Sequence, residues 1–220
     1  MSRAAMKLRA IFFDFDGVIM DSMHLKLEGY CLAMAPYGFA RDDVNRLMRR
    51  YMGQSRRRII RFMHAELAGS EMPDDEFERA LRVFNEHDEA SRADMQPIPG
   101  SLEFLKRVHQ DLFTAVVTGT PEDFILRTTE YHDLDRYFDI VRGSPDTKRE
   151  ILAELLATNG LSPAESLFIG DGRTDQEAAD HHGIRFVGLD NGDASFQPAT
   201  AWRVVRDLNE LRDVVSAGRA

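Results

Sequence analysis

The sequence predicts an α/β fold in which a doubly wound parallel sheet is interrupted by an all-helical insertion. From residue 101 onward, short apolar runs alternate with helical patterns. This alternation is typical of a parallel sheet covered by helices on both faces. Residues 21–94 keep helical spacing and contain no convincing strand. We therefore expect a core domain of residues 1–20 and 95–220, with residues 21–94 as an inserted helical domain.

The first predicted strand covers residues 8–15 and ends in two carboxylates. Its apolar stretch leads directly into Asp14 and Asp16, and Gly17 then turns the chain. Alternate residues of a strand point the same way, so the two side chains converge at its carboxyl end. Carboxylates held close together repel each other unless a cation or a shared proton relieves them. The pair therefore predicts Mg²⁺ and phosphoryl chemistry.

The insertion has apolar residues at helical spacing over residues 59–67 and again over 77–84. Such stripes indicate amphipathic helices. Asp74, which follows Pro73, is the expected N-cap of the second stripe. Two prolines within residues 96–100 stiffen the return connection, and we interpret them as part of a hinge.

The remaining core elements follow the same alternation of period. We expect helices near 101–108, from about 121 with Thr120 as N-cap, over 147–158 and over 174–182, the last ending at Gly183. Strands are expected over 112–118, 166–169, 184–189 and 202–205, and a final helix over 208–215.

The composition bounds the possible partners and compartments. The chain has 220 residues, 43% of them hydrophobic, and a formal net charge of -9. The acidic balance argues against general nucleic-acid binding. The single cysteine, Cys31, excludes an intrachain disulfide. No apolar run is long enough to span a bilayer, and acidic residues interrupt the first one too early for a signal peptide. We expect a cytoplasmic protein without a membrane partner; its oligomeric state stays open.

Chemically useful residues follow the ends of several predicted elements. They are Asp14 and Asp16, the segment Thr118-Gly119-Thr120, Lys148, and Asp171 with Asp175. The carboxyl ends of parallel strands share one edge of a sheet, so residues far apart in sequence can meet there. A nucleophile, a hydroxyl, a cation and further carboxylates are the parts that phosphoryl transfer with a metal requires.

These motifs, in this order, resemble the four signatures of the haloacid dehalogenase superfamily. The helical block after the first motif resembles the C1 cap of its phosphoglycolate phosphatase and β-phosphoglucomutase branch. The resemblance covers nearly the whole chain and implies a Rossmann-like core with a helical cap domain. It also implies a phosphatase, because the dehalogenase and phosphonatase branches do not place an aspartate at the position of Asp16.

The resemblance assigns a role to each matching residue. Asp14 is the expected nucleophile, which forms an aspartyl-phosphate, and Asp16 the expected general acid and base. Thr118 and the backbone of Gly119 are expected to hold phosphate oxygens. Lys148 is expected to neutralise charge between Asp14 and the phosphate.

The same resemblance implies a Mg²⁺ cofactor with oxygen ligands. The expected ligands are the Asp14 carboxylate, the Asp16 backbone carbonyl and the Asp171 carboxylate. Asp175 is expected to support the metal waters or Lys148.

Two assignments leave alternatives open. Lys26 and Lys106 are the other candidates for the site lysine, although Lys148 alone lies between the second and fourth motifs. Residues 41–61 contain eight arginines and two aspartates, either a surface that attracts anionic substrates or a solvated helix face. Within this stretch Gly53-x-Ser55-Arg56 resembles the cap specificity loop of β-phosphoglucomutase. Arg56 is thus the expected substrate contact, ahead of Arg57 and Arg49.

The predicted function is hydrolysis of a small phosphorylated metabolite. A sugar phosphomutase is the first alternative. The resemblance to the mutase is weaker at two places. The mutase has Glu-Asp at the fourth motif, where this chain has Gly170-Asp171, and Lys-Pro at the third motif, where this chain has Lys148-Arg149. Both differences favour the phosphatase. A non-catalytic binding module on the same fold is the second alternative, and the complete set of motif residues weighs against it.

Overall fold

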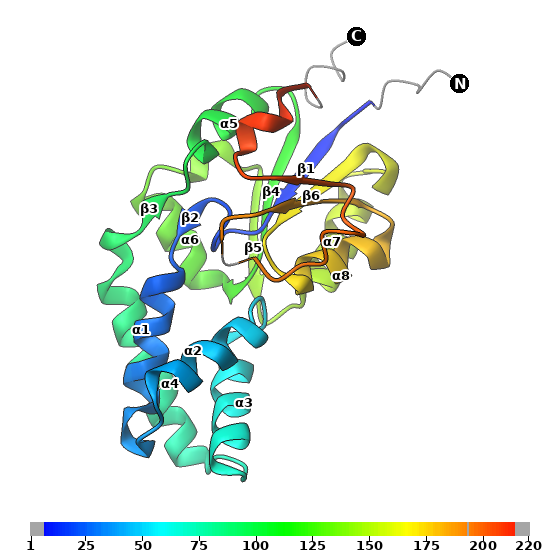
Figure 1. Cartoon of the computed structure of the whole chain (residues 1–220). Coiled ribbons are helices and arrows are strands. Elements are labelled where there is room, and N and C mark those ends of the chain that lie inside the picture. The colour runs from blue at the N-terminus through cyan, green and yellow to red at the C-terminus, as the bar shows by residue number, and fades with distance from the viewer. Residues whose placement is uncertain (1–6, 193, 214–220) are drawn as a thin grey trace.

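The computed structural model describes residues 7–192 and 194–213 and has the predicted α/β fold (Figure 1). Its six-stranded sheet has the order β5-β4-β1-β6-β7-β8, and all neighbouring strands run parallel. The strands are β1 (Ala10–Phe13), β4 (Phe113–Pro121), β5 (Ile140–Ser144), β6 (Ser166–Gly170), β7 (Arg185–Leu189) and β8 (Arg203–Val205). Because β1 pairs with β4 on one side and β6 on the other, its carboxyl end lies between theirs.

Helices cover both faces of the sheet, and the side chains of β1 alternate between the two cores. Ile11 and Phe13 pack in one cluster with residues of α5 (Ser101–Val108) and α6 (Glu122–Tyr131). Ala10 and Phe12 pack in the other with residues of α7 (Lys148–Thr158) and α8 (Arg173–His182). This two-residue period explains why the first strand is apolar throughout: both of its faces are buried.

Four further helices lie on the side of the sheet toward which β1 runs (Figure 1). They are α1 (Met23–Met34), α2 (Arg41–Arg50), α3 (Arg56–Ala68) and α4 (Asp74–Ala90), and they enclose a hydrophobic cluster of their own. The antiparallel pair β2 (Met20–Asp21) and β3 (Gln96–Pro97) connects them to the rest of the chain. The cap boundaries at residues 21 and 94 stay a prediction.

Short 3-10 helices complete the described chain: η1 (Ala35–Tyr37), η2 (Arg92–Asp94), η3 (Asp135–Tyr137), η4 (Pro163–Glu165) and η5 (Leu208–Leu211). Of the predicted final helix over 208–215, η5 occupies residues 208–211 and residues 212 and 213 continue as helix, whereas residues 214 and 215 lie outside the described residues. Among the described residues, no helix combines the length and the apolar character needed to cross a membrane.

Two expected N-caps were wrong by one residue, and one strand of the six-stranded sheet was missed. Asp74 is the first residue of α4, where its carboxylate pairs with Arg61 at 3.0 Å, and Pro73 takes the cap position. Thr120 lies within β4, and its hydroxyl donates a hydrogen bond to the Asp16 carboxylate instead of capping a helix. The missed strand, β5, is an edge strand of mostly half-buried residues, so its sequence lacks the apolar run that marks a central strand.

Candidate active site

Asp14 occupies the end of the central strand β1. Its backbone N–H donates to the carbonyl of Ile169 at 2.9 Å, which continues the pairing with β6 beyond the strand. The carboxylate is buried and accepts a hydrogen bond from the Phe15 N–H at 2.8 Å. Gly17, with φ of 76°, then reverses the chain. The sheet therefore fixes this carboxylate by backbone bonds on both sides of the side chain.

Lys148 is the cation that reaches Asp14. It is the first residue of α7. A capping box between Thr147 and Glu150 stabilises the start of this helix. Its Nζ lies 2.7 Å from Asp14 Oδ2 and 2.5 Å from Asp175 Oδ1. Burial alone would lower the pKa of Lys148, but the two carboxylates raise it above its usual value. Lys148 therefore stays charged and connects Asp14 of the first motif with Asp175 of the fourth. Its role toward a phosphate stays a prediction.

Asp171 and Asp175 stand beyond the end of β6. Asp171 is buried and accepts a hydrogen bond from Asn191 Nδ2 at 2.9 Å. Asp175 is fully buried and accepts from the Gly172 N–H at 3.0 Å. Burial, with the negative charges of Asp14 and Asp175, raises the pKa of Asp171 well above its usual range. Burial and the charge of Asp14 raise the pKa of Asp175 to about 7.

The arrangement of these carboxylates fits a divalent cation. Asp14, Asp171 and Asp175 each offer an oxygen, and these atoms all lie within 4.8 Å of one another. One lysine cannot neutralise three buried carboxylates. Burial and the charge of Asp14 therefore raise the pKa values of Asp171 and Asp175. Hard oxygen donors suit Mg²⁺. The carboxylate of Asp16 does not belong to this group, so a metal role for Asp16 through its backbone carbonyl stays a prediction.

Asp16 is instead surrounded by donors. Its carboxylate accepts hydrogen bonds from Ser22 Oγ and Thr120 Oγ1, both at 2.6 Å, and it forms an ion pair with Lys26 Nζ. Burial would raise the pKa of Asp16, but Lys26 and the hydrogen bonds together lower it to about 2. The sequence reasoning missed Ser22 and Lys26 as partners of Asp16. A lone lysine on a helix ten residues downstream carries no signal of such a contact.

Thr118 and Gly119 lie where β4 passes under the cap. Thr118 is buried, and its Oγ1 accepts a hydrogen bond from the Thr120 N–H at 3.2 Å. A Cβ at Gly119 would lie only 2.7 Å from the carbonyl oxygen of Gly53. A Cβ at Gly53, whose φ is 82°, would collide with the Thr174 side chain. Both glycines thus permit the cap loop to rest directly on the core.

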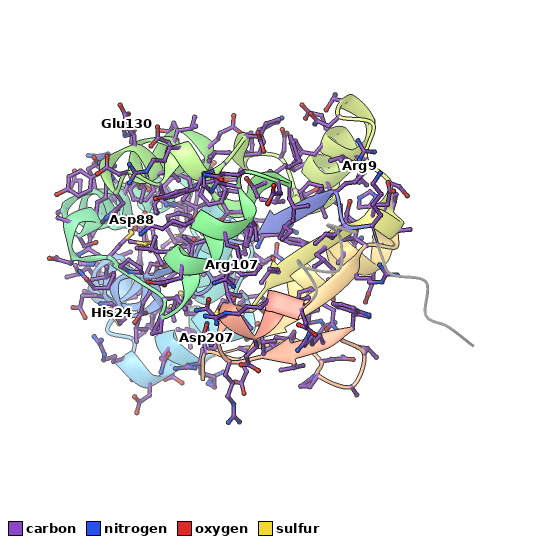
Figure 2. All side chains as sticks on the ribbon, turned by 90° about the horizontal axis from the view of Figure 1, so that it is seen from above. Arg9, His24, Asp88, Arg107, Glu130 and Asp207 are labelled. Atoms are coloured by element: carbon purple, nitrogen blue, oxygen red, sulfur yellow. The ribbon has the colours of Figure 1, made fainter. Side chains whose placement is uncertain are left out.

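Arg56 is the first residue of α3, and its guanidinium is engaged within the protein. Its Nη2 lies 2.5 Å from Asp88 Oδ2, without the alignment of a hydrogen bond, and its Nη1 donates to Asn85 Oδ1 at 2.8 Å. The guanidinium also stands over the rings of Phe84 and Phe124, at 4.9 and 5.1 Å from their centroids. Figure 2 labels Asp88 on the side of the molecule where the cap helices lie. A direct role of Arg56 in substrate binding stays a prediction.

The other two cap arginines of the sequence prediction are further from the reaction centre. Arg57 pairs with Glu78 at 2.9 Å, and both side chains are more than half exposed. Arg49 donates to Asn45 Oδ1 at 3.1 Å. Neither lines the cavity that contains Asp14. For most arginines of residues 41–61 the structure thus favours the solvated helix face.

A small cavity joins the two halves of the site. Its volume is about 40 Å³, enough for a few water molecules. The core lines it with residues of all four motifs, namely Asp14, Asp16, Thr118, Gly119, Thr120, Lys148 and Asp171. The cap contributes Lys26, Tyr30, Gln54 and Arg56 together with apolar side chains. The predicted motif residues are therefore brought together, except that Asp175 lies behind Lys148.

The family model for haloacid dehalogenase-like hydrolases matches residues 11–189, which include every one of these motifs. The chain belongs to this family. The family prediction is therefore confirmed, and with it the prediction of a hydrolase.

Curated relatives cover nearly the whole chain. Phosphoglycolate phosphatase 1 of Pseudomonas aeruginosa is 29% identical, covering 94% of this chain and 78% of its own. The phosphorylated carbohydrates phosphatase of Thermotoga maritima is 28% identical, with 96% and 92% covered. These relatives place the chain beside the phosphatases of the family.

Solved structures show the same fold. A predicted phosphoglycolate phosphatase from Haemophilus somnus superposes with a TM-score of 0.81 at 22% identity, covering 97% of this chain and 99% of its own. A β-phosphoglucomutase-type protein from Bacteroides vulgatus gives 0.77 at 20% identity, with 97% and 90% covered. The predicted fold class is confirmed by these neighbours.

Proposed function

We propose that this protein is a Mg²⁺-dependent phosphatase that hydrolyses a small phosphate monoester through an aspartyl-phosphate. The observation that carries the proposal is the convergence of Asp14, Lys148 and Asp171 on one cavity, with Asp175 paired to Lys148 behind it. The relatives from Pseudomonas and Thermotoga, both named as phosphatases of phosphorylated small molecules, support the same substrate class.

In the first step, Asp14 attacks phosphorus and the bond from phosphorus to the ester oxygen breaks. Asp16 is ionised before the ester binds. It takes up a proton, which the monoanion of the phosphate ester supplies, and passes it to the departing oxygen, so the alcohol leaves neutral. Lys148 holds the Asp14 carboxylate in place, and Thr118 with the backbone of Gly119 binds phosphoryl oxygens. In the second step, Asp16 takes a proton from water, which attacks phosphorus and releases inorganic phosphate and free Asp14.

Asp14, Asp171 and the Asp16 carbonyl would hold Mg²⁺, with Asp175 supporting Lys148. When bound, the ion supplies charge stabilisation to the transferring phosphoryl group. We also propose that residues 21–94 act as a cap, which closes on the core through the contact of Gly53 with Gly119 and excludes water.

The test is the Asp14→Asn variant assayed with p-nitrophenyl phosphate and Mg²⁺. The carboxamide keeps the size of the side chain but cannot form the phosphoenzyme, so phosphate release should fall to background. Asp21→Asn, an exposed aspartate of β2, is the matched control and should retain activity. Turnover by Asp14→Asn at the rate of the unaltered protein would overturn the nucleophile assignment.

A further inference from the structure

Lys26 is the cap cation directed at the reaction centre. It lies on α1, and its Nζ contacts Asp16 Oδ2 and lies 3.0 Å from Thr120 Oγ1. Its side chain is only 15% exposed, and that of Asp16 only 12%. The ammonium group thus lines the cavity beside the Asp16 carboxylate, which in the proposed mechanism a departing ester oxygen must also approach.

Arg56, which the sequence favoured for this task, differs in its partners. Its charge is matched by Asp88, a carboxylate that belongs to the cap and is 1% exposed. The ring of Phe124, from the core helix α6, covers the guanidinium on one side. Among the residues that the structure describes, the ion pair of Lys26 is with Asp16, the proposed general acid, and not with a carboxylate of the cap.

Most of the remaining cap surface of the cavity is apolar. Its apolar side chains are Met23, Met48, Met52, Ile59 and Phe84. Tyr30 and Gln54 also line the cavity and are uncharged, so Lys26 and Arg56 are the charged cap residues in this lining. A small leaving group with an anionic substituent would therefore meet Lys26 as its charged partner.

We propose that Lys26 selects phosphate esters whose leaving group carries a second anion, such as a carboxylate, close to the ester oxygen. This inference rests on the proposed function. The departing oxygen must reach Asp16 to receive its proton, and Lys26 Nζ stands at that carboxylate. A carboxylate one or two carbons from the oxygen is then within reach of the ammonium. An ester of a neutral alcohol makes no such ion pair, and Lys26 then keeps Asp16 as its ion-pair partner.

The experiment compares two esters of similar size, 2-phosphoglycolate and 2-hydroxyethyl phosphate, which differ in one carboxylate. Phosphate release is measured with Mg²⁺ for the unaltered protein, Lys26→Met, Lys26→Arg and the control Lys106→Met. Lys106 is an exposed lysine of α5 outside the cavity. The readout is the ratio of kcat/KM for the two esters, which cancels any general loss caused by disturbing Asp16.

We expect the unaltered protein and Lys106→Met to prefer the carboxylated ester. Lys26→Met should lower that preference about 10- to 100-fold, the usual worth of a charged hydrogen bond. Lys26→Arg, which keeps the charge, should retain a preference for the carboxylated ester even if Lys26→Met does not fold.

Two results would overturn the inference. Equal kcat/KM for both esters in the unaltered protein, or an unchanged ratio in Lys26→Met, would reject Lys26 as the selector while Asp14-dependent phosphate release leaves the proposed function intact. Failure of the folded, unaltered protein to release phosphate from these esters and from p-nitrophenyl phosphate would reject both.

Discussion

The core and the cap each bury an ion pair, and the two pairs differ in what surrounds them. Lys148 lies between two carboxylates of the sheet edge and faces the cavity, so its charge is available to an incoming phosphate. Arg56 also lines the cavity, but it is paired with Asp88 of the cap and stands over aromatic rings of α4 and α6. Burial of a charged group therefore does not by itself identify a functional residue; the two pairs differ in whether the partner belongs to the reaction centre.

Breaking the cap pair should have the largest effect on stability. Arg56→Met leaves Asp88 buried without its partner, which costs about 3–5 kcal/mol of unfolding free energy. Adding Asp88→Leu removes the orphaned charge and should recover most of that loss. Urea unfolding followed by circular dichroism measures both.

The control for this prediction is Arg57→Met, which removes a more than half exposed partner of Glu78. An exposed pair contributes about 0–1 kcal/mol, so this variant should unfold close to the unaltered protein. Equal losses in Arg56→Met and Arg57→Met would show that the buried pair has no special weight.

Removing the lysine of the core ion pair should lower the rate of catalysis. Lys148→Met removes the cation beside Asp14, and we expect kcat for p-nitrophenyl phosphate to fall about 10²- to 10³-fold. Lys106→Met, on the exposed side of α5, should keep normal kinetics. A folded Lys148→Met protein with unaltered kcat would remove Lys148 from the machinery.

A smaller and pH-dependent effect concerns the metal. Because the folded protein raises the pKa of Asp175 to about 7, ionising this group costs stability as pH rises from about 4 to 7. A cation at the carboxylates relieves that cost, so Mg²⁺ should raise Tm more at pH 8 than at pH 5. At 100 times its Kd the gain is about 2.7 kcal/mol.

The pKa of Asp16 is shifted in the opposite direction to that of Asp175, so its ionisation does not change between pH 5 and pH 8 and does not affect the comparison of Tm values. Its pKa is lowered to about 2, so its stabilising contribution is present above about pH 4 and is lost only as pH falls toward 2. Asp171→Asn, which removes one proposed ligand, should lose most of the Mg²⁺-induced rise in Tm. A rise of equal size at both pH values and in this variant would contradict the proposed metal site.

Sequence reasoning reached the core side of the site because local patterns encode it. An apolar strand followed by Asp14, or by Asp171, is visible in the chain itself, and a parallel sheet brings such strand ends together. Lys26 was named only as an alternative to Lys148, and Asn191 was not named. Only tertiary packing places these two residues against Asp16 and Asp171. The same holds for Asp88, whose position on α4 gives no hint of a buried arginine nearby.

The measurement that tests the central claim most directly is a rapid acid quench of the protein during turnover of p-nitrophenyl phosphate with Mg²⁺, followed by peptide mass spectrometry. The account predicts a phosphoryl group on the peptide that contains Asp14, absent from the Asp14→Asn variant and from protein treated with a chelator. A phosphoryl group on a peptide from another part of the chain, or steady turnover without any phosphorylated peptide, would contradict it.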